Sequence, residues 1–228
     1  MATIFITGAN RGLGLEFVRQ FADAGHRVIA TSRGHGEELA ALAAEHPEQI
    51  SLYPLDVNDA GQAAALSAKL AGTPIDIFVC NAGINSPPAT IDAIDETGFL
   101  KVMQTNVMAP MRLVGLFTEN VAISDRKLML FLGSRMGSVG TNDRGGGYVY
   151  RASKAALHAV VKSLSIDLAP RGIACVLVHP GAAKTAMAGA RGTVEVSDSV
   201  SGMIALLERD NAALNGRLFN YTGEEIPW

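Results

Sequence analysis

The stretch Thr3–Gly14 reads T-I-F-I-T-G-A-N-R-G-L-G and decides the fold. Its first five residues are β-branched or aromatic, a composition typical of a buried strand. Glycines then crowd the point where that strand must turn, and apolar side chains recur at helical spacing from Leu13 to Phe21. The stretch therefore predicts a strand, a glycine turn and a helix in succession.

The same alternation of strands and helices continues along the chain. We expect strands at 27–31, 50–55, 75–80, 127–133, 174–179 and 217–221, and helices at 37–45, 60–70, 97–118, 148–168 and 200–208. Three of these strands, I-D-I-F-V-C, K-L-M-L-F-L-G and A-C-V-L-V-H, are apolar almost throughout, as in a parallel sheet covered by helices on both faces. The predicted fold is an α/β, Rossmann-type doubly wound parallel sheet, with residues 1–228 forming one domain.

Composition narrows the classes of function. The 228 residues are 48% hydrophobic and 18% charged, which allows a large core and excludes a disordered chain. A net charge of −3 argues against nucleic-acid or anionic-membrane partners. No apolar run approaches the roughly 20 residues that cross a bilayer, and no signal pattern is present, so we expect a cytoplasmic protein. Cys80 and Cys175 lie in apolar runs, which predicts buried, reduced thiols and no metal site.

The glycines at 8, 12 and 14 have the spacing G-x-x-x-G-x-G, which differs from the dinucleotide fingerprint G-x-G-x-x-G. Where a strand turns into a helix, missing Cβ atoms let backbone amides approach a pyrophosphate. Glycines alone are weak evidence, because a tight strand-to-helix turn without any ligand would use them too. The setting favours cofactor binding.

The end of the second strand bears on which dinucleotide binds. An Asp or Glu there would bind the ribose 2′-hydroxyl of NAD, but the chain reads Thr31-Ser32-Arg33. Without a carboxylate to repel a 2′-phosphate, and with the guanidinium of Arg33 to bind one, NADP is predicted over NAD. Arg11 could contact the same phosphate, although both arginines could instead be ordinary solvated residues. Asp23 lies at a similar offset but should sit on the surface of the first helix.

Tyr150 and Lys154 are four residues apart in Y-R-A-S-K, so they share one face of a helix. A phenol near pKa 10 is a poor acid or base at neutral pH, and an adjacent ammonium favours the phenolate. Lowering that pKa by about two units needs roughly 3 kcal/mol, which Lys154 and a nicotinamide cation together could supply. The plain alternative is a tyrosine packed on a lysine stem. Tyr148 is an internal control, because the residue four after it is Ala152.

Taken together and in order, these motifs resemble the short-chain dehydrogenase/reductase family: T-G-A-N-R-G-L-G, N-A-G at 81–83, Asn106, Ser134, Y-R-A-S-K at 150–154 and P-G at 180–181. The resemblance spans nearly the whole chain. Three further segments, N-R-G-L-G, S-R-M-G-S and Y-T-G-E-E-I-P-W, are most similar to the C-factor-like and sniffer-like carbonyl reductase branch.

The resemblance implies NADP(H)-dependent hydride transfer between nicotinamide and a small carbonyl or alcohol. Tyr150 would be the general acid or base, Lys154 would lower its pKa and hold the ribose, and Asn106 would kink its helix to position a water. Ser134 would orient the substrate oxygen, because it ends a strand and precedes a glycine by three positions. Ser138 stays open as the alternative, since it lies 12 residues before Tyr150, nearer the expected spacing than the 16 of Ser134. Asn106 could also be an ordinary helix-surface amide.

Carried over residue by residue, the resemblance also predicts the cofactor site. It would be formed by Gly8, Ala9, Asn10, Arg11, Gly12, Leu13, Gly14, Ser32, Arg33, Asp56, Val57, Asn81, Ala82, Gly83, Tyr150, Lys154, Pro180, Gly181 and Thr185, with no metal. Asp56 could be only a turn residue. Cys80 replaces the asparagine that often precedes N-A-G in the family, which we interpret as a packing change.

Three further expectations concern the substrate, the assembly and an alternative function. The segment 182–197 is short and rich in small residues, which predicts a mobile lid over an open site that accepts varied aldehydes or ketones. The resemblance implies a homodimer or homotetramer. A different class of function also stays open, namely an NADP-binding redox sensor or signalling protein with little or no turnover, although such a protein has no chemical need for the Ser, Tyr, Lys and Asn set.

Overall fold

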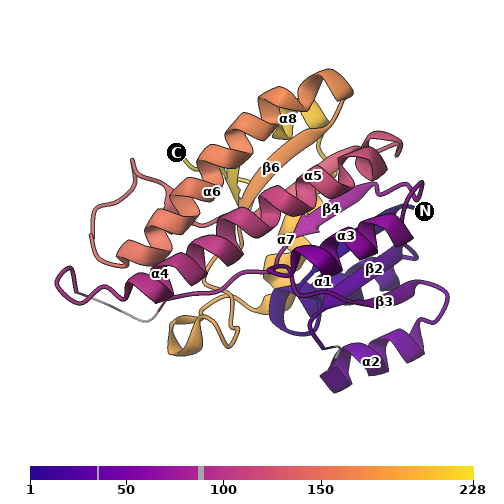
Figure 1. Cartoon of the computed structure of the whole chain (residues 1–228), viewed down its shortest axis with the longest axis horizontal. Coiled ribbons are helices and arrows are strands. Elements are labelled where there is room, and N and C mark those ends of the chain that lie inside the picture. Colours follow the sequence, from indigo (N-terminus) through magenta and orange to yellow (C-terminus); the bar gives the residue numbers. More distant parts are fainter. Residues whose placement is uncertain (35, 87–89) are drawn as a thin grey trace.

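The fold, taken from a computed structural model that describes residues 1–34, 36–86 and 90–228, is a seven-stranded sheet between two layers of helices (Figure 1). The strands are β1 (Thr3–Thr7), β2 (Arg27–Ser32), β3 (Ile50–Pro54), β4 (Ile77–Cys80), β5 (Leu128–Leu132), β6 (Ala174–His179) and β7 (Leu218–Asn220). Their order across the sheet is β3-β2-β1-β4-β5-β6-β7, and every neighbouring pair is parallel. The predicted doubly wound α/β fold is confirmed.

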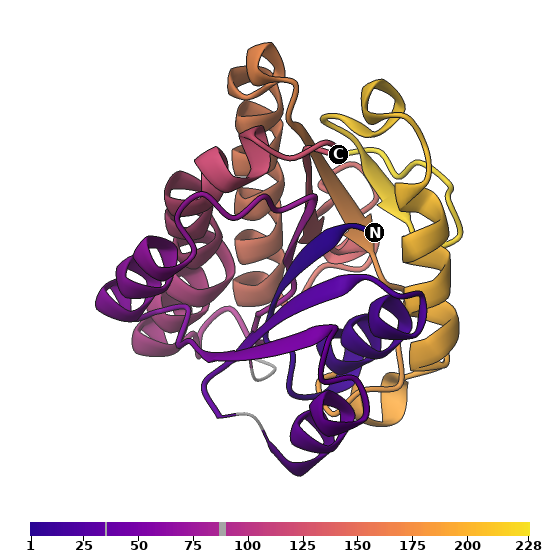
Figure 2. The same cartoon turned by 90° about the vertical axis from the view of Figure 1, so that its right-hand side faces the viewer.

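The helices divide between the two faces of the sheet. They are α1 (Gly12–Asp23), α2 (Gly36–Glu45), α3 (Ala60–Lys69), α4 (Glu96–Met103), α5 (Ala109–Ala122), α6 (Tyr148–Asp167), α7 (Val196–Leu207) and α8 (Asn211–Leu214). Apolar side chains of α1, α2, α7 and α8 pack on one face, and those of α3, α5 and α6 pack on the other. Figure 2 shows the two groups of helices on either side of the strands.

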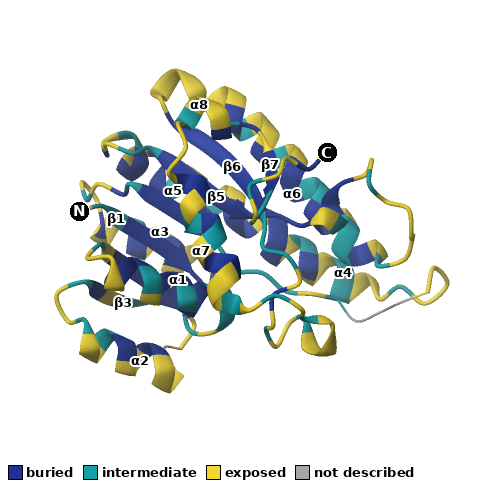
Figure 3. Ribbon diagram, turned by 180° about the vertical axis from the view of Figure 1, so that it is seen from behind, coloured by how far each residue is buried: buried dark blue, intermediate teal, exposed yellow. Residues whose placement is uncertain are grey.

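Burial on both faces explains the apolar strands. In β5, Leu128, Leu130 and Leu132 belong to the core under α1 and α7, whereas Met129 and Phe131 belong to the core under α5 and α6. All five residues are buried, which removes the polar alternation of a one-sided sheet. Figure 3 shows the inner strands mostly dark blue and the outer helix faces mostly yellow, whereas the edge strand β3 is only partly buried.

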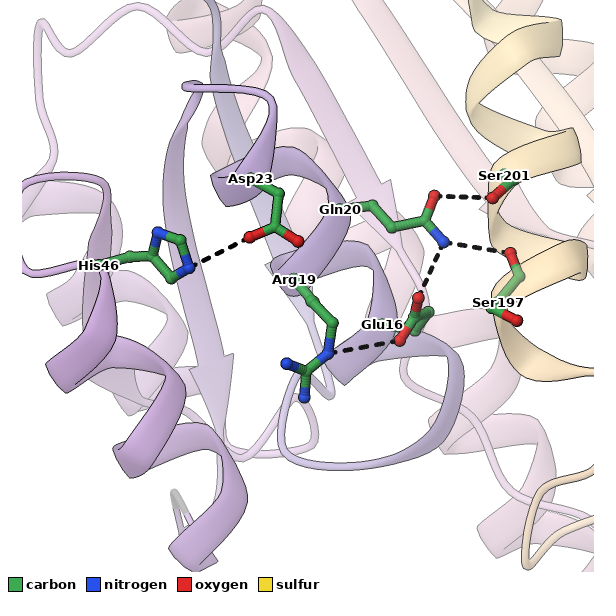
Figure 4. A network of polar contacts seen from close by, with 7 residues as sticks. All are labelled: Glu16, Arg19, Gln20, Asp23, His46, Ser197 and Ser201. Atoms are coloured by element: carbon green, nitrogen blue, oxygen red, sulfur yellow. Dashed lines mark hydrogen bonds and ion pairs between the residues drawn. The ribbon is translucent and has the colours of Figure 1, made fainter.

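Polar contacts fix the helix that follows the glycine turn. The amide of Gln20 on α1 donates to the Ser197 carbonyl at 3.1 Å and accepts from the Ser201 hydroxyl of α7 at 3.1 Å (Figure 4). On the other side of α1, Asp23 lies 3.2 Å from the imidazole of His46, just after α2. Asp23 is therefore a surface residue of α1, as predicted. These contacts hold α1, and with it the glycine turn at its first residue.

Two features differ from the sequence expectation. Helix α7 begins at Val196, four residues before the predicted start. Ser197 and Ser199 are residue types typical of loops, but here the Ser199 hydroxyl donates to the Pro180 carbonyl at 2.6 Å and anchors the first turn of the helix. The short helix α8 was not predicted, since four residues carry too little periodicity.

Cys80 and Cys175 are unpaired and buried, as predicted, and burial raises the pKa of the Cys175 thiol to about 12. Within the described residues, no helix has the length and apolar character needed to span a membrane.

Strand order places the site. From β1 the chain winds outward through β2 and β3, and then returns to β4 on the other side of β1. The connections on either side of this point leave the sheet in opposite directions, which opens a crevice at the carboxyl ends of the strands. The glycine turn after β1 and the N-A-G turn after β4 both lie at this switch point.

Candidate active site

The glycine turn after β1 adopts a conformation that side chains would prevent. Gly8 and Gly12 have φ values of +67° and +55°, in the left-handed region that glycine adopts at little cost. A Cβ atom on Gly14 would lie 2.2 Å from the carbonyl oxygen of Gly8 and 2.6 Å from the side-chain nitrogen of Asn81. Within the turn, Ala9 is buried and its amide donates to the Thr31 carbonyl at 3.0 Å. The glycines therefore serve the shape of the turn itself.

Helix α1 begins in this turn without a cap. No side chain bonds its first-turn amides, its N-cap residue is Arg11, and its first turn holds no acidic residue. By contrast, Asp59 caps α3 and Asp95 caps α4 through their carboxylates. The open amides and the positive end of the helix dipole make this N-terminus suitable for an anion.

The N-A-G turn is bonded to the glycine turn across the switch point. The Asn81 amide donates to the carbonyls of Thr7 and Gly8 at 2.8 and 3.1 Å. In return, the Thr7 hydroxyl accepts from the backbone amides of Asn81 and Ala82, both at 3.0 Å. A Cβ on Gly83 would lie 3.3 Å from the Asn106 side chain. The two turns thus form one rigid unit.

The ends of β2 and β3 hold the residues predicted for the adenosine half of the cofactor. Arg33 is exposed, and its side chain forms no ion pair or hydrogen bond with the described part of the chain. The hydroxyl of the buried Ser32 donates to the Gly34 carbonyl at 3.1 Å. Asp56 accepts from the Asn58 amide at 2.9 Å, so its carboxylate does shape a turn, and Val57 is buried beside it. Arg33 is thus available to a ligand.

The segment after β6 crosses the glycine turn. A Cβ on Gly12 would lie 3.3 Å from the methyl group of Thr185, which brings this residue, predicted for the cofactor site, against the glycine turn. Gly181 has φ +71° and packs against Tyr221. Ala183 pairs with Val194 in a parallel bridge, and Lys184 forms an ion pair with Glu195. The predicted lid is therefore closed on itself by backbone and ionic contacts.

Tyr150, Lys154 and Ser134 converge at the end of β5. Tyr150 and Lys154 lie on one face of α6, with the ammonium 5.7 Å from the centre of the phenol ring. The Ser134 hydroxyl, at the carboxyl end of β5, lies near enough to the phenol to lower the pKa of Tyr150. The buried Lys154 ammonium donates to the Leu132 carbonyl at 2.7 Å. Tyr148 is exposed and therefore lies in a different environment from Tyr150.

Burial of Tyr150 works against the predicted lowering of its pKa. Burial raises the pKa of the phenol above its ordinary value, and the nearby Ser134 hydroxyl opposes that rise. Burial also lowers the pKa of Lys154 to about 8, because the ammonium loses its hydration. The expectation counted on the charges of Lys154 and a nicotinamide cation together. In the protein by itself, desolvation of the phenol outweighs the effect of Ser134.

Asn106 lies in a π-helical turn, Gln104–Met108, that joins α4 to α5. Its amide nitrogen donates to the Ile84 carbonyl at 2.9 Å and to the Ser153 hydroxyl at 3.0 Å, while its oxygen accepts from the Ile84 amide at 2.9 Å. The side chain is buried, so Asn106 is not a surface amide. The predicted distortion of the helix is present, but this side chain is occupied by bracing contacts, so a water would have to use the main-chain carbonyl.

Ser138 has a different partner from Ser134. Its hydroxyl donates to the Pro227 carbonyl at 2.5 Å and accepts from the Thr141 amide at 3.3 Å. The Ser134 hydroxyl accepts from the Met136 amide at 3.1 Å and also reaches Tyr150. The geometry favours Ser134 for the chemistry, and assigns Ser138 to anchoring the last residues of the chain.

A cavity of ≈ 220 Å³ lies beside this cluster, between the ends of β5, β6 and β7. Its lining includes Arg135, His179, Asn220 and Glu224, so much of its wall is polar. Sequence reasoning missed the contribution of the segment after β7. Short polar runs near a chain end carry no periodicity, although Y-T-G-E-E-I-P-W did stand out as a motif.

Known proteins share this arrangement along the whole chain. The family model described as short chain dehydrogenase matches residues 2–195, which include the glycine turn, Ser134, Tyr150 and Lys154. The chain belongs to the short-chain dehydrogenase family. Membership makes it an oxidoreductase of the hydride-transfer type, and the family expected from the motifs is confirmed.

Individual members of the short-chain dehydrogenase family support the predicted branch. The carbonyl reductase Sniffer of D. melanogaster is 30% identical with a TM-score of 0.92, and the comparison covers 100% of both chains. An NADPH-bound carbonyl reductase from chicken fatty liver is 29% identical with a TM-score of 0.91, covering 100% of this chain and 99% of that one. C-signal of Myxococcus xanthus is 34% identical over 164 residues, which are 72% of this chain and 99% of that protein.

Proposed function

We propose that this short-chain dehydrogenase is an NADP(H)-dependent enzyme that transfers hydride between nicotinamide and a carbonyl or alcohol, with Tyr150 as general acid and base. The observation that carries the proposal is the convergence of three groups. The centre of the Tyr150 ring lies 5.7 Å from the Lys154 ammonium, and the Ser134 hydroxyl lies near enough to the phenol to lower its pKa. These groups lie at the same, carboxyl edge of the sheet as the dinucleotide-type glycine turn, with β4 between β1 and β5.

The residues at the switch point fit a dinucleotide. The uncapped N-terminus of α1 would bind the pyrophosphate. The backbone of the glycine turn approaches Gly14 so closely that no side chain would fit there. Asn81, Gly83 and Thr185 would line the remaining length, and Arg33 would bind a 2′-phosphate. When bound, the nicotinamide supplies or accepts the hydride.

The proton would pass through Tyr150. In reduction, the phenol would donate its proton to the developing alkoxide, and in oxidation the phenolate would remove it. The Ser134 hydroxyl would donate a hydrogen bond to the same oxygen and hold the carbonyl in place. Lys154 would stabilise the phenolate, which is the form that burial disfavours in the protein alone.

A panel of aldehydes and ketones tests the activity. Purified protein is expected to consume NADPH with several members of the panel, with product alcohol formed in equal amount. Consumption of NADPH without alcohol would indicate a contaminating oxidase. If no member of the panel is reduced and no alcohol is oxidised with NADP⁺, the proposed enzyme activity is wrong.

Cofactor choice has its own test. Arg33→Asp is expected to weaken NADPH binding by about tenfold to a hundredfold, because a charge-assisted contact to phosphate is replaced by repulsion, while NADH binding stays the same or improves. Fluorescence titration with both cofactors measures the change. Arg27→Asp, at the exposed first residue of β2 and thus at the opposite end of that strand from Arg33, is the matched control for a surface charge reversal. An unchanged preference in Arg33→Asp would remove Arg33 from the site.

A signalling function is the second candidate, because a relative of 34% identity carries the name C-signal. In that case NADPH would bind with the same preference but the panel would stay unreduced. The family resemblance also leads us to propose a homodimer or homotetramer through α5 and α6, where Met108, Met111 and Ile166 are exposed. Light scattering of the purified protein measures the assembly.

A further inference from the structure

His158 is a buried imidazole that the proposed chemistry does not use. It lies on α6 one turn after Lys154 and two turns after Tyr150, so the three side chains share one face of the helix. Only 2% of its surface is exposed. The contacts of the buried imidazole therefore indicate its role.

The imidazole fits inside the turn that carries Ser134. The backbone amide of Ser134 donates to Nε2 of His158 at 3.3 Å. A Cβ on Gly133 would lie 3.2 Å from the same nitrogen, and a Cβ on Gly137 would lie 2.5 Å from Cε1. The two glycines that flank the serine by one and three positions thus make room for the ring, and the turn wraps around it.

The far side of the ring is held by the last residues of the chain. The Trp228 ring packs edge-on against His158, with the centroids 5.9 Å apart and the planes at 81°. The Trp228 carbonyl accepts from the Gly140 amide at 3.1 Å, and the Pro227 carbonyl accepts from the Ser138 hydroxyl. The same segment therefore fixes both the imidazole and the loop after Ser134.

We infer that His158 is a positioning residue, which sets the place of the Ser134 hydroxyl relative to Tyr150 by accepting the backbone amide of Ser134, with Trp228 holding the ring. One face of α6 would then carry the proton donor Tyr150, the ammonium of Lys154 and the imidazole of His158 that positions Ser134. Burial, together with the nearby charge of Lys154, lowers the pKa of His158 to about 4, so the ring is neutral at neutral pH. Its Nε2 accepts from the Ser134 amide, and its buried Nδ1 has no partner among the described residues. This inference rests on the proposed function, since it gives Ser134 a role in the reaction.

Two substitutions separate the hydrogen bond from simple packing. His158→Gln keeps a polar group near the position of Nε2, whereas His158→Leu keeps bulk and removes the acceptor. We expect His158→Leu to lower kcat about tenfold, because small displacements of a reacting group are costly. KM and the Kd for NADPH should change less than twofold. His158→Gln should retain more than half of kcat. Val161→Ala, a buried substitution on the same helix, is the control for lost stability.

The decisive measurement is a double-mutant cycle with Ser134→Ala. If His158 acts through the serine, adding His158→Leu to Ser134→Ala should lower kcat by less than twofold. Equal losses from His158→Leu and His158→Gln, or the full tenfold loss in the Ser134→Ala background, would overturn the inference. A wild-type kcat for Ser134→Ala alone would instead overturn the proposed role of the serine.

Trp228→Ala provides a second route if His158→Leu fails to fold. It should lower kcat about threefold in the wild-type background and not at all in Ser134→Ala, with NADPH affinity unchanged in both. Trp228→Phe, which keeps an aromatic edge, should restore most of the loss. A loss of the same size in both backgrounds would show that Trp228 acts on overall stability and contradict the inference.

Discussion

The two ends of the switch-point crevice are built from different parts of the protein. At the adenosine end, the decisive atoms belong to the backbone: two left-handed glycines, a third that no side chain could replace, and an uncapped helix. At the chemical end they belong to side chains, the buried Ser134 and Lys154 and the half-buried Tyr150, which come from the end of β5 and from α6. The adenosine end depends on glycines, which have no Cβ atom, and the chemical end depends on polar groups held in place where water is scarce.

The comparison predicts that substitutions at the chemical end abolish turnover while leaving the cofactor bound. Ser134→Ala should lower kcat by about 10²–10³-fold, the range found when one donor to a developing oxyanion is removed. Ser138→Ala should lower kcat less than threefold, because its hydroxyl is bonded to Pro227. Steady-state kinetics with NADPH titration measures both variants. The reverse ranking would assign the chemistry to Ser138.

At the adenosine end, the expected effect is on binding. Gly14→Ala should weaken NADPH binding about a hundredfold, since its Cβ would lie 2.2 Å from the Gly8 carbonyl oxygen and the turn must move. Gly115→Ala in α5 is the matched control, because its Cβ would have no neighbour within 4 Å and alanine favours helix by up to about 1 kcal/mol. Calorimetric titration and thermal melts separate affinity from stability. Wild-type affinity in Gly14→Ala would show that the turn is not a cofactor site.

The chemical end should also be sensitive to acid. His158 has a folded pKa of about 4, below its unfolded value of 6.5, so between these pH values the unfolded chain binds a proton that the folded chain does not. Stability should therefore fall as the pH drops from 6.5 to 4, by about 2 kcal/mol from this group at pH 5. His158→Gln should lose correspondingly less stability between pH 7 and pH 5. Urea unfolding at the two pH values measures the difference, and equal losses would contradict the buried, neutral imidazole.

The residues of the two ends could not be predicted equally well from the sequence, and the reason is physical. The glycine turn, Asn81 and Arg33 could be located because each follows a strand, and the carboxyl ends of parallel strands meet at one edge. The pair Tyr150 and Lys154 could be placed because helix spacing fixes a shared face. Spacing along the chain could not settle Ser134 against Ser138.

Contacts between residues far apart in the chain favour Ser134 over Ser138 and reveal the positions of His158 and Trp228. The Pro227 carbonyl that occupies Ser138 lies 89 residues away in sequence. The raised pKa of Tyr150 likewise follows from burial, which no local motif reports. The strands and most helices matched their predicted ranges because their apolar periodicity is local, whereas α8 is too short to show one.

Hydride transfer in a single turnover tests the central role of Tyr150 most directly. Tyr150→Phe, premixed with NADPH and then with a reducible carbonyl, should show hydride transfer slowed at least about a thousandfold, because the proton donor is gone, with NADPH affinity unchanged. Tyr148→Phe, on the exposed side of the same helix turn, should transfer at the wild-type rate. A Tyr150→Phe rate within a few-fold of wild type would contradict the assignment of the proton to this phenol.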